Sequence, residues 1–479
     1  MNKVLVLIKK IIPKFLFKKI QPVYHLIMNW LAAVWYGFPS NKLIVVGITG
    51  TTGKTTTVFM TAELLRQAGL KVGYTSTAMF SDGNRDWLNS KKMTMLGRFF
   101  TQQMLQKMVK NRCDVAIVET TSEGIVQNRH RFINYDIAEF TGLYPEHIDS
   151  HGSFENYKKA KLGLFEHLER CHTKQFSSGS TTGDPVVEPL EKSKVESQKV
   201  SVEKTIIVNL DDDLAGEFLD FEVDRKIGFK KVESKNPPKS SRAQILTPFT
   251  QGVEKIDYQF LEMNKVGTRF IFDGMEVQLK ILGDFNALNA TAAGCIGKAL
   301  GIDNEQIKKG LESIESLPGR LERIEEEQDF TVIVDYAFEP VAVSKLYETI
   351  KVLEPNKIIH VFGSTGGGRD LSRRSKLGKI AGEKADYVIV TNEDPYDDDP
   401  MEIIKDVAEG AKEVGKVQDE DLFLVEDRKE AIKKAVSLAK KRDIVLATGK
   451  GSEQAIAVKD GKLIPWDDRE TVRGIINCK

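Results

Sequence analysis

The stretch GITGTTGKTTT, residues 47–57, constrains this chain more than any other part of it. The residues before it, LIVVG, are short, apolar and β-branched, which predicts a buried strand. The residues after it, TTTVFMTAELLRQAG, have apolar positions at helical spacing and end at a glycine, which predicts a helix. Glycines between a strand and a helix let backbone N–H groups approach phosphate closely. The stretch therefore predicts a nucleotide-binding loop.

The residues of this loop have expected roles in holding a nucleotide. The candidate binding residues are Gly50, Thr51, Thr52, Gly53, Lys54, Thr55 and Thr56. Lys54 would reach the β and γ phosphates, and Thr55 would place its hydroxyl on Mg²⁺. The spacing departs from the common form, because Gly47, Gly50 and Gly53 are three residues apart. The alternative is a turn rich in glycine and threonine that binds no ligand, but the order strand, loop, lysine, threonine, helix favours a nucleotide.

Length and composition set wider limits. A chain of 479 residues has room for two or three domains, and 41% hydrophobic and 29% charged residues are ordinary for a soluble globular protein. The net charge of zero gives no argument for nucleic acid. The cysteines are scattered, with no zinc spacing and no disulfide framework, which fits a reducing cytoplasm. They are Cys113, Cys171, Cys295 and Cys478.

The N-terminal stretch, residues 1–20, is basic and apolar. Its apolar runs are too short to span a bilayer, and no small-residue cleavage site follows them. Two interpretations stay open: a helix packed on the body of the protein, or a basic amphipathic segment on an anionic membrane surface. In the next helical stretch we expect one apolar face to pack in the core. That face consists of Val23, Leu26, Ile27, Trp30, Leu31, Val34 and Trp35.

The rest of the chain predicts an α/β protein of two domains. Apolar runs at 113–119, 136–143 and 205–213 read as further strands, and Glu119 falls at a strand end, where ligand groups gather in an open parallel sheet. Residues 173–204 read as a flexible insertion, residues 244–282 as antiparallel strands, and residues 286–301 as a helix. Four more buried strands alternate with helical segments after Pro318.

The predicted organisation has three segments. Residues 1–40 form a short basic helical segment, and residues 41–316 a central P-loop ATPase domain with a mostly parallel sheet. Residues 317–479 form a C-terminal Rossmann-like α/β domain. We find no internal sequence repeat.

Several motifs follow one another in a fixed order. They are GITGTTGKTTT, ETTSEGIVQNR, FTGLYPEHIDSHGSFENYKKAK, GDFNALNATAA, LPGRLERI, VDYAFEP, FGSTGGGRD, NEDPYDDDP and GKGSEQ. This series resembles the Mur ligases of peptidoglycan synthesis, of the type that adds the third residue of the stem peptide. The resemblance covers the chain from Asn41 onward and rests on the joint order of the motifs, each of which is weakly specific alone.

The resemblance implies a function. Such a ligase uses ATP to phosphorylate a carboxylate, and an incoming amine then attacks the acyl phosphate to form an amide, with release of ADP and phosphate. It implies ATP and two Mg²⁺ sites, small-molecule substrates, no nucleic acid partner, a monomer and a cytoplasmic location, with peripheral membrane contact through residues 1–20 as an addition.

The resemblance also places roles on matching residues. Lys54, Glu119, His147 and Lys161 would be catalytic, and the metal ligands would be Thr55, Glu119, His147 and a carbamylated Lys161. Thr121, Ser122 and Arg129 would face the acidic acceptor. Asn289 would lie near the adenine, and Arg320 and Asp335 would bind ATP from a C-terminal domain that acts as a lid.

From the residues alone, blander interpretations stay open. Glu119 also fits a solvated carboxylate at a strand end, and His147 a histidine of a surface loop, since imidazole is not a favoured ligand of Mg²⁺. YKKAK, residues 157–161, also reads as a solvated helix face, which we expect of Lys158 and Lys159.

Some positions depart from the family pattern. The nucleotide loop begins at Gly47, so the long N-terminal domain that grips the UDP-sugar in the family is not expected, and the acceptor carrier stays open. Glu123 and Phe338 stand where histidines are usual.

The incoming amino acid is expected to meet Asp394, Tyr396, Gly449 and Glu453. Tyr396 replaces an arginine that grips the distal carboxylate of diaminopimelate, and tyrosine cannot pair with a carboxylate bidentately. The acids at 397–399 would suit an amine-tipped side chain such as lysine, unless they form a solvated acidic loop.

Two other functions compete with this one. The first is a ligase of the same superfamily acting on a lipid-linked muropeptide or a polyglutamate-type acceptor. The folate enzymes' loop usually continues Lys-Gly-Ser where this chain has Lys-Thr-Thr, and the lipid-II subunit's four-cysteine ribbon is not found here. The second is a nucleotide-binding scaffold without turnover, against which the retained Lys54, Thr55, Glu119, His147 and Lys161 argue.

Overall fold

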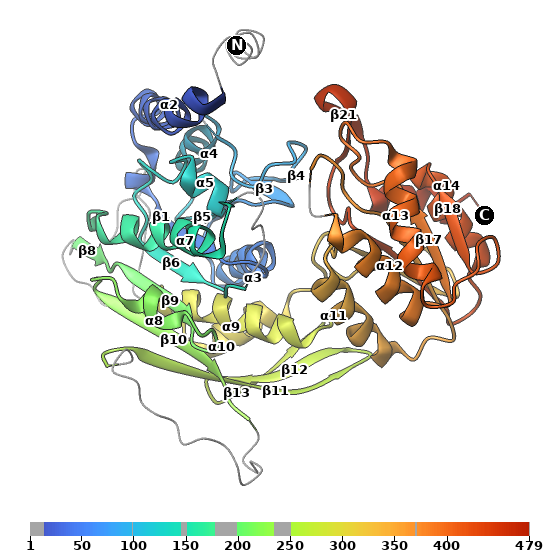
Figure 1. Cartoon of the computed structure of the whole chain (residues 1–479). Helices are drawn as coiled ribbons and strands as arrows, with labels where there is room; N and C mark the ends of the chain where they lie inside the picture. Colours follow the sequence, from blue (N-terminus) through green and yellow to red (C-terminus); the bar gives the residue numbers. More distant parts are fainter. Residues whose placement is uncertain are drawn as a thin grey trace.

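The structure, a computed structural model, describes residues 14–97, 99–144, 151–177, 199–233, 251–368 and 371–478. Two α/β bodies lie side by side in Figure 1, each built around its own sheet. We call residues 44–312 the middle domain and residues 322–476 the C-terminal domain.

The middle domain is built on one sheet of eleven strands, in the order β13-β12-β11-β10-β9-β6-β1-β5-β2-β3-β4. The strands are β1 (Ile44–Thr49), β2 (Val72–Thr75), β3 (Met79–Ser81), β4 (Asp86–Leu88), β5 (Val115–Glu119), β6 (Ile137–Phe140), β9 (Thr205–Asn209), β10 (Arg225–Lys231), β11 (Glu254–Asn264), β12 (Gly267–Phe272) and β13 (Met275–Leu279). The pairs from β2 through to β11 are parallel, while both outer ends of the sheet are antiparallel. The predicted strands at 43–47, 113–119, 136–143 and 205–213 are confirmed.

Helices cover both faces of this sheet. They are α3 (Lys54–Gln67), α4 (Phe99–Lys110), α5 (Ser122–Val126), α7 (Phe154–Glu169), α8 (Ala215–Leu219), α9 (Asp284–Ala299) and α10 (Asn304–Glu312). Alternate residues of β1 enter two separate cores: Val46 and Ile48 pack on the side of α3 and α9, and Val45 on the side of α4 and α7. A strand buried on both faces requires the continuous apolar run from which the sequence predicted it.

The C-terminal domain has a six-stranded sheet in the order β14-β15-β19-β16-β17-β18, parallel except for β14. Its strands are β14 (Glu322–Ile324), β15 (Thr331–Asp335), β16 (Ile358–Phe362), β17 (Tyr387–Thr391), β18 (Leu422–Val425) and β19 (Ile444–Thr448). Its helices are α11 (Pro340–Ile350), α12 (Ser372–Lys384), α13 (Pro400–Lys412), α14 (Arg428–Leu438) and α15 (Asp468–Ile476). Two apolar cores on opposite faces confirm the doubly wound α/β fold.

Smaller elements complete the chain. A hairpin of β20 (Ala455–Val458) and β21 (Lys462–Pro465) follows the last parallel strand, and short 3₁₀ helices lie at Pro39–Lys42, Lys351–Leu353 and Lys459–Gly461. Within the predicted flexible insertion at 173–204, residues 178–198 lie outside the described part. The two ends of that insertion pair as β7 (Lys174–Ser177) and β8 (Lys199–Val202), so a wholly irregular segment is not what the structure has.

The first helix, α2 (Lys14–Trp35), overturns one prediction. The apolar face that was expected in the core is exposed, with Ile27 at 51%, Trp30 at 48% and Trp35 at 78%. The opposite face holds the helix against the middle domain, through buried Asn29 and Ala32. Asn29 Nδ2 donates to the carbonyl oxygen of Asn128, 3.0 Å away. The predicted helix and its apolar face are present, but the helix packs against the middle domain with its smaller and more polar side chains.

Candidate active site

The nucleotide loop joins β1 to α3, as predicted. Gly50 and Gly53 have φ angles of 153° and 82°, which favour glycine. A Cβ at Gly50 would lie 1.8 Å from Thr141 Oγ1, so no side chain fits there. Lys54 folds back over the loop, and its Nζ donates to the carbonyl oxygens of Gly50 at 3.0 Å and Thr51 at 2.7 Å. The backbone N–H groups at the start of α3 lie next to this ammonium, which is the arrangement that attracts an anion.

Glu119 lies beside the loop at the carboxyl end of β5. Thr55 Oγ1 donates to Glu119 Oε2 over 2.9 Å. Thr77 adds two bonds, from its backbone N–H to Oε2 at 2.8 Å and from Oγ1 to Oε1 at 2.9 Å. Glu119 is 1% exposed, so its carboxylate is buried among these hydrogen-bond donors and is not a solvated group at the strand end. Sequence reasoning missed Thr77, since no motif marks it.

Lys161 lies under the same loop. It projects from α7, is 1% exposed, and donates from Nζ to the carbonyl oxygen of Gly50 over 2.5 Å. Its Nζ lies 4.6 Å from the centre of the Tyr157 ring, and the hydroxyl of Tyr157 lies 3.3 Å from Thr51 Oγ1. By contrast Lys158, on the same helix, pairs with Glu217 at 2.9 Å, and Lys159 is exposed. Of the lysines in YKKAK, only Lys161 reaches the nucleotide loop. His147 lies outside the described residues.

The side chains around the nucleotide loop offer some of the oxygen donors that Mg²⁺ needs. Among the described residues no group of three or more His, Cys, Asp or Glu side chains gathers. Mg²⁺ commonly takes one or two carboxylates, with substrate phosphates and waters completing its shell. Glu119 and Thr55 supply oxygens of this kind, so they fit one such ion. The amine of Lys161 cannot ligate as a cation, and would fit only as a carbamate.

The predicted acceptor residues lie on and around α5. The Thr121 hydroxyl accepts from the N–H of Gly124 at 3.2 Å and caps this helix. Ser122 Oγ lies 3.0 Å from His151 Nε2. Arg129 donates to the carbonyl oxygen of Met95 and to Gln127 Oε1. These groups lie along one segment beyond Glu119.

Asn289 packs against the nucleotide loop from α9. A Cβ at Gly53 would lie 2.4 Å from Asn289 Oδ1, which shows how closely this side chain approaches the loop. Asn289 Nδ2 donates to Asn286 Oδ1 at 3.2 Å.

Arg320 and Asp335 lie where the C-terminal domain begins. The guanidinium of Arg320 stacks on the ring of Tyr336, 4.3 Å from its centre. Arg320 and Pro318 line a small pocket together with Thr55 and Thr56 of α3. Asp335 accepts from the N–H groups of Leu321 and Ala337, both at 2.7 Å, while burial raises the pKa of its carboxyl. The pocket brings Arg320 to the nucleotide loop, and Asp335 braces the segment that carries Arg320.

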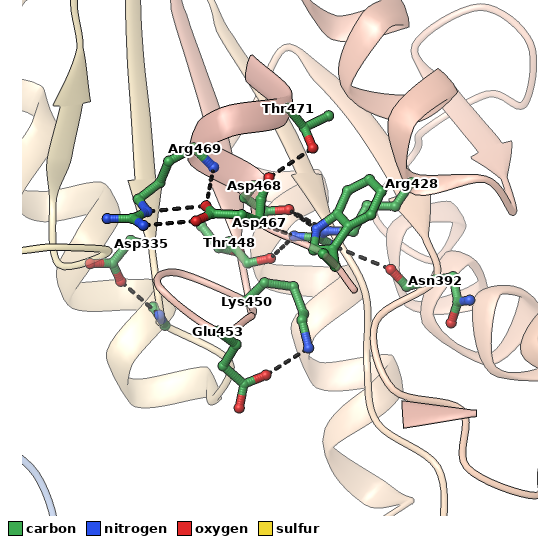
Figure 2. A network of polar contacts seen from close by, with 12 residues as sticks. Asp335, Asn392, Arg428, Thr448, Lys450, Glu453, Asp467, Asp468, Arg469 and Thr471 are labelled. Carbon is green, nitrogen blue, oxygen red and sulfur yellow. Dashed lines mark hydrogen bonds and ion pairs between the residues drawn. The ribbon is translucent and has the colours of Figure 1, made fainter. Parts of the chain in front are cut away.

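Four charged side chains form what we call the acid–lysine cluster, namely Lys92, Asp394, Lys450 and Glu453. Lys450 is wholly buried and donates to Glu453 Oε2 at 2.6 Å and to Asp394 Oδ1 at 3.1 Å. Figure 2 shows the ion pair of Lys450 with Glu453. Lys92, from the turn after β4 in the middle domain, donates to Asp394 and lies 3.2 Å from Glu453. Two ammonium groups thus share two carboxylates.

The two lysines of the acid–lysine cluster differ in pKa. Burial opposes the charge of Lys450, but Glu453 and Asp394 raise its pKa above the ordinary value. Burial and the neighbouring Lys450 lower the pKa of Lys92. Lys450 is therefore the more firmly held cation.

Arg428 ties together the two strand ends that carry this cluster (Figure 2). It pairs with Asp468 through two bonds of 2.8 and 2.7 Å, with both side chains almost fully buried. Its remaining N–H groups donate to the carbonyl oxygens of Asn392, after β17, and of Thr448, at the end of β19. Sequence reasoning missed Arg428, because no motif contains it.

The three acids at 397–399, predicted as a rim for the substrate, are exposed and also accept hydrogen bonds within the C-terminal domain. Asp399 caps α13 by accepting from Met401 and Glu402, and Asp397 accepts from the N–H of Asp460 at 2.9 Å. Asp398 accepts from Gly367 at 3.0 Å. Asp398 also lies 3.6 Å from the guanidinium of Arg374. The role of these three acids toward a substrate stays a prediction.

The remaining two predicted contacts shape the same region. Tyr396 has a φ of 52° and its N–H donates to Ala457 at 3.1 Å, which joins the motif to the β20 hairpin. Gly449 has a φ of 97°, and a Cβ there would lie 2.5 Å from Glu393 Oε2. Burial and the adjacent Asp394 raise the pKa of Glu393 to about 6.

Comparison with known proteins agrees with this geometry. Residues 48–204 match the Mur ligase middle domain, and residues 319–451 match the Mur ligase, glutamate ligase domain. The UDP-N-acetylmuramyl-tripeptide synthetase of Borreliella burgdorferi is 35% identical over 453 residues, covering 94% of this chain and 79% of the relative. The chain belongs to the Mur ligase family. It is thus an ATP-dependent, amide-forming ligase.

A second relative and one solved structure widen the comparison. The UDP-N-acetylmuramoyl-L-alanyl-D-glutamate--2,6-diaminopimelate ligase of Halalkalibacterium halodurans is 29% identical over 92% of this chain and 80% of its own length. The fold is shared with the folylpolyglutamate synthase of Mycobacterium tuberculosis, with a TM-score of 0.60 and 16% identity over 89% of this chain and 93% of that one. No helix in the described part of this Mur ligase is long and apolar enough to cross a membrane.

Proposed function

We propose that this Mur ligase joins an amino acid to a carboxylate of a peptidoglycan precursor, UDP-N-acetylmuramoyl-L-alanyl-D-glutamate or a similar acceptor. A carboxylate oxygen of the acceptor attacks the γ-phosphorus of ATP, ADP leaves, and an acyl phosphate forms. The amine of the amino acid then attacks the acyl carbon, and phosphate leaves as the amide bond forms.

The observation that carries this proposal is the meeting of Thr55, Glu119 and Lys161 around one nucleotide loop, within a chain of this family. The ammonium of Lys54 would donate its hydrogen bonds to the phosphates of ATP instead of to the carbonyl oxygens of Gly50 and Thr51. Its positive charge would offset the negative charge of the phosphates. The glycines leave the backbone N–H groups of the loop free of side chains, so that phosphate approaches closely.

Magnesium is proposed at two sites. Thr55 and Glu119 would hold the first, and His147 with a carbamylated Lys161 the second. Bound there, Mg²⁺ would offset the charge of the phosphates and of the acceptor carboxylate. Lys161 lies deep enough for a carbamate to stay away from bulk water, and Tyr157 and the loop would fix its position.

The C-terminal domain is proposed to act as a lid. Arg320 faces the nucleotide loop across a small pocket, so a modest closure would bring its guanidinium onto the phosphates. Asp335 would stand on the ribose side, and Asn289 near the adenine. Closure would exclude water from the hydrolysable acyl phosphate.

The acceptor is proposed to lie over α5, where Thr121, Ser122 and Arg129 gather. A carboxylate of the acceptor substrate would replace the Met95 carbonyl and the Gln127 amide as the partner of Arg129. A carboxylate forms the stronger hydrogen bonds with a guanidinium. Glu119 and Lys161 border the same region from the nucleotide side.

The amino acid is proposed to carry a second amine, as lysine does. Asp394 and Glu453 already accept the ammonium of Lys92, so an amine of the substrate could take the place of that ammonium. Tyr396 cannot pair bidentately with a distal carboxylate as an arginine does, which disfavours diaminopimelate. Gly449 lets the backbone lie close to Glu393, the neighbour of Asp394.

Three further points belong to the proposal. The ligase would work as a monomer on small-molecule substrates, without nucleic acid, and in the cytoplasm. Contact with the inner face of the membrane through residues 1–20 is considered with helix α2 below.

One experiment tests the function directly. Purified protein is incubated with ATP, Mg²⁺ and UDP-N-acetylmuramoyl-L-alanyl-D-glutamate, amino acids are added singly, and phosphate release and product mass are followed. Release that needs both the acceptor and lysine supports the proposal. Release with diaminopimelate alone would contradict the lysine assignment, and no release with any amino acid would contradict the acceptor.

A further inference from the structure

Helix α2 displays a large apolar surface. Six side chains at helical spacing form what we call the α2 face: Val23, Ile27, Trp30, Leu31, Val34 and Trp35. Each is between 41% and 78% exposed. Patches of this kind on a soluble protein mark an interaction site, because leaving so many large apolar groups in water is unfavourable.

The α2 face is not left over from poor packing. The other side of the helix is well held, with Asn29, Ala32 and Ala33 at 4%, 0% and 0% exposed. The Asn29 amide bonds the carbonyl of Asn128, and the Asn128 amide in turn bonds the carbonyl of Pro22 at 3.4 Å. These polar bonds fix the rotation of the helix about its axis, so the α2 face points outward. Figure 1 shows α2 at the outer end of the middle domain, next to α4 and away from the C-terminal domain.

The charge of this part of the chain identifies the partner. The first acidic residue of the whole sequence is Glu63. Before it stand only basic charges, at Lys3, Lys9, Lys10, Lys14, Lys18, Lys19, Lys42 and Lys54. A basic stretch that precedes an apolar helix face with tryptophans in the sequence suits the interface of an anionic bilayer, where indole rings lie at headgroup level and lysines meet the lipid phosphates.

We propose that the α2 face docks this enzyme on an anionic membrane surface. The apolar side chains would enter the headgroup boundary while the helix lies in the plane of the membrane. A second copy of the chain is the poorer occupant, since pairing two α2 faces would bring two basic segments together with no acid near them in sequence. The proposal does not depend on which amino acid or acceptor the ligase uses.

The test is vesicle binding by the full-length protein. Sedimentation with vesicles of phosphatidylcholine alone is compared with vesicles that also contain phosphatidylglycerol, at low and high salt. We expect binding at least about tenfold stronger with the anionic lipid, weakened by salt, with a blue shift of tryptophan emission. Equal binding to both vesicles, or none to either, would overturn the proposal.

A variant assigns the binding to the α2 face. Ile27→Gln, Trp30→Gln and Leu31→Gln together remove apolar area without changing charge. We expect about a tenfold loss of vesicle binding, with ligase turnover on a soluble acceptor unchanged. The matched control is Val266→Gln with Val417→Gln, two exposed valines elsewhere, at 69% and 49%, which should leave binding intact.

Two results would count against the α2 face specifically. Retention of full binding by the triple variant would do so, as would a wild-type dimer in sedimentation velocity that the triple variant abolishes. The wild-type comparison of the two lipids stands even if the triple variant fails to fold.

Discussion

The ammonium of Lys92, from the middle domain, lies 3.2 Å from the carboxylate of Glu453 in the C-terminal domain. It also contacts Asp394, 302 residues further along the chain. This contact spans the two domains at the place proposed for the distal amine of the incoming amino acid. For the proposed distal amine to bind these two carboxylates, the ammonium of Lys92 would have to leave them.

Replacing Lys92 with methionine should strengthen binding of the amino acid. The methionine keeps the apolar stem but removes the cation that competes for Asp394 and Glu453. We expect the KM for lysine to fall by about threefold to tenfold, equivalent to about 1 kcal/mol. Steady-state kinetics with lysine as the varied substrate measure this. Lys91→Met, on the exposed neighbour, should change nothing; a higher KM in Lys92→Met would mean that Lys92 assists binding instead.

Replacing Glu453 with glutamine should weaken binding of a diamine. It leaves one carboxylate, Asp394, for both Lys450 and the substrate. We expect the KM for lysine to rise about tenfold or more, since charge-assisted hydrogen bonds are the strong ones. The ratio of kcat/KM for lysine to that for norleucine, which has no distal amine, separates this effect from general damage. An unchanged ratio would remove Glu453 from the specificity pocket.

Replacing Lys161 with alanine should abolish turnover, because the carbamate oxygens proposed for the second Mg²⁺ are then lost. Added acetate should restore part of the rate, since a small carboxylate supplies oxygens of the same kind. Phosphate release at rising acetate concentration measures this. Lys158→Ala on the same helix should stay active, because the ion pairs of Lys158 within the described part of the chain are with Glu155 and Glu217. Rescue by amines rather than acetate would contradict the carbamate.

Replacing Arg320 with alanine should raise the KM for ATP about tenfold and slow turnover, without unfolding the protein. The guanidinium stacks on Tyr336 and donates to the carbonyl oxygen of Gly319, and the buried Asp335 beside it keeps its two backbone N–H donors when the guanidinium is removed. ATP kinetics and thermal unfolding are the measurements. Arg323→Ala, at a nearby exposed position, serves as the control. Kinetics equal to the wild type would exclude Arg320 from the lid.

Glu139 should make the protein less stable as pH rises. It is fully buried in β6, and neither carboxylate oxygen has a hydrogen-bond partner among the described residues. Burial raises the pKa of Glu139 well above its ordinary value of 4.5, with only Lys54 opposing. The folded state therefore keeps the proton that the unfolded chain releases. The contribution of Glu139 to stability is full below pH 4.5 and is lost as pH rises towards the folded-state pKa.

Glu139→Gln removes this titration. Relative to the wild type, the free energy of unfolding of the variant should improve by up to about 1.4 kcal/mol for each pH unit above 5. Urea unfolding at several pH values measures the difference. Glu315→Gln, whose side chain is 81% exposed, should run parallel to the wild type. A constant gap between wild type and Glu139→Gln across this range would show that Glu139 is ionised in the folded protein.

Local patterns carried much of the fold and part of the site. The nucleotide loop, β1 and α3 were predictable because strand, turn and helix signals are contiguous there. Glu119 was predictable because a strand end is also a local feature. Lys161 and Lys158 have the same sequence surroundings, and only their angular positions on α7 separate a buried ammonium from a surface one.

Other features depend on contacts between distant residues. Lys92 meets Asp394 across the domain boundary, and no local pattern signals such a pair. Helix periodicity located the apolar face of α2 but not whether anything covers it, since the pattern is the same for a core face and for a docking face. Composition also does not show that the acids at 397–399 accept hydrogen bonds from a helix N-terminus and from distant backbone N–H groups.

Arg428 restricts which substitutions the region around the acid–lysine cluster can tolerate. One guanidinium, neutralised by Asp468, holds the backbone after β17 and the end of β19 at a fixed separation. The side chains proposed to contact the amino acid lie on or next to those two segments, and the bonds of Arg428 hold the segments at their spacing. A substitution at a position such as Tyr396 could therefore change the substrate preference without disturbing these segments. A substitution at Arg428 would leave the buried carboxylate of Asp468 without its partner and would remove the bonds that hold both segments. In evolutionary terms, we expect Tyr396 to vary among related ligases of different specificity and Arg428 to be retained.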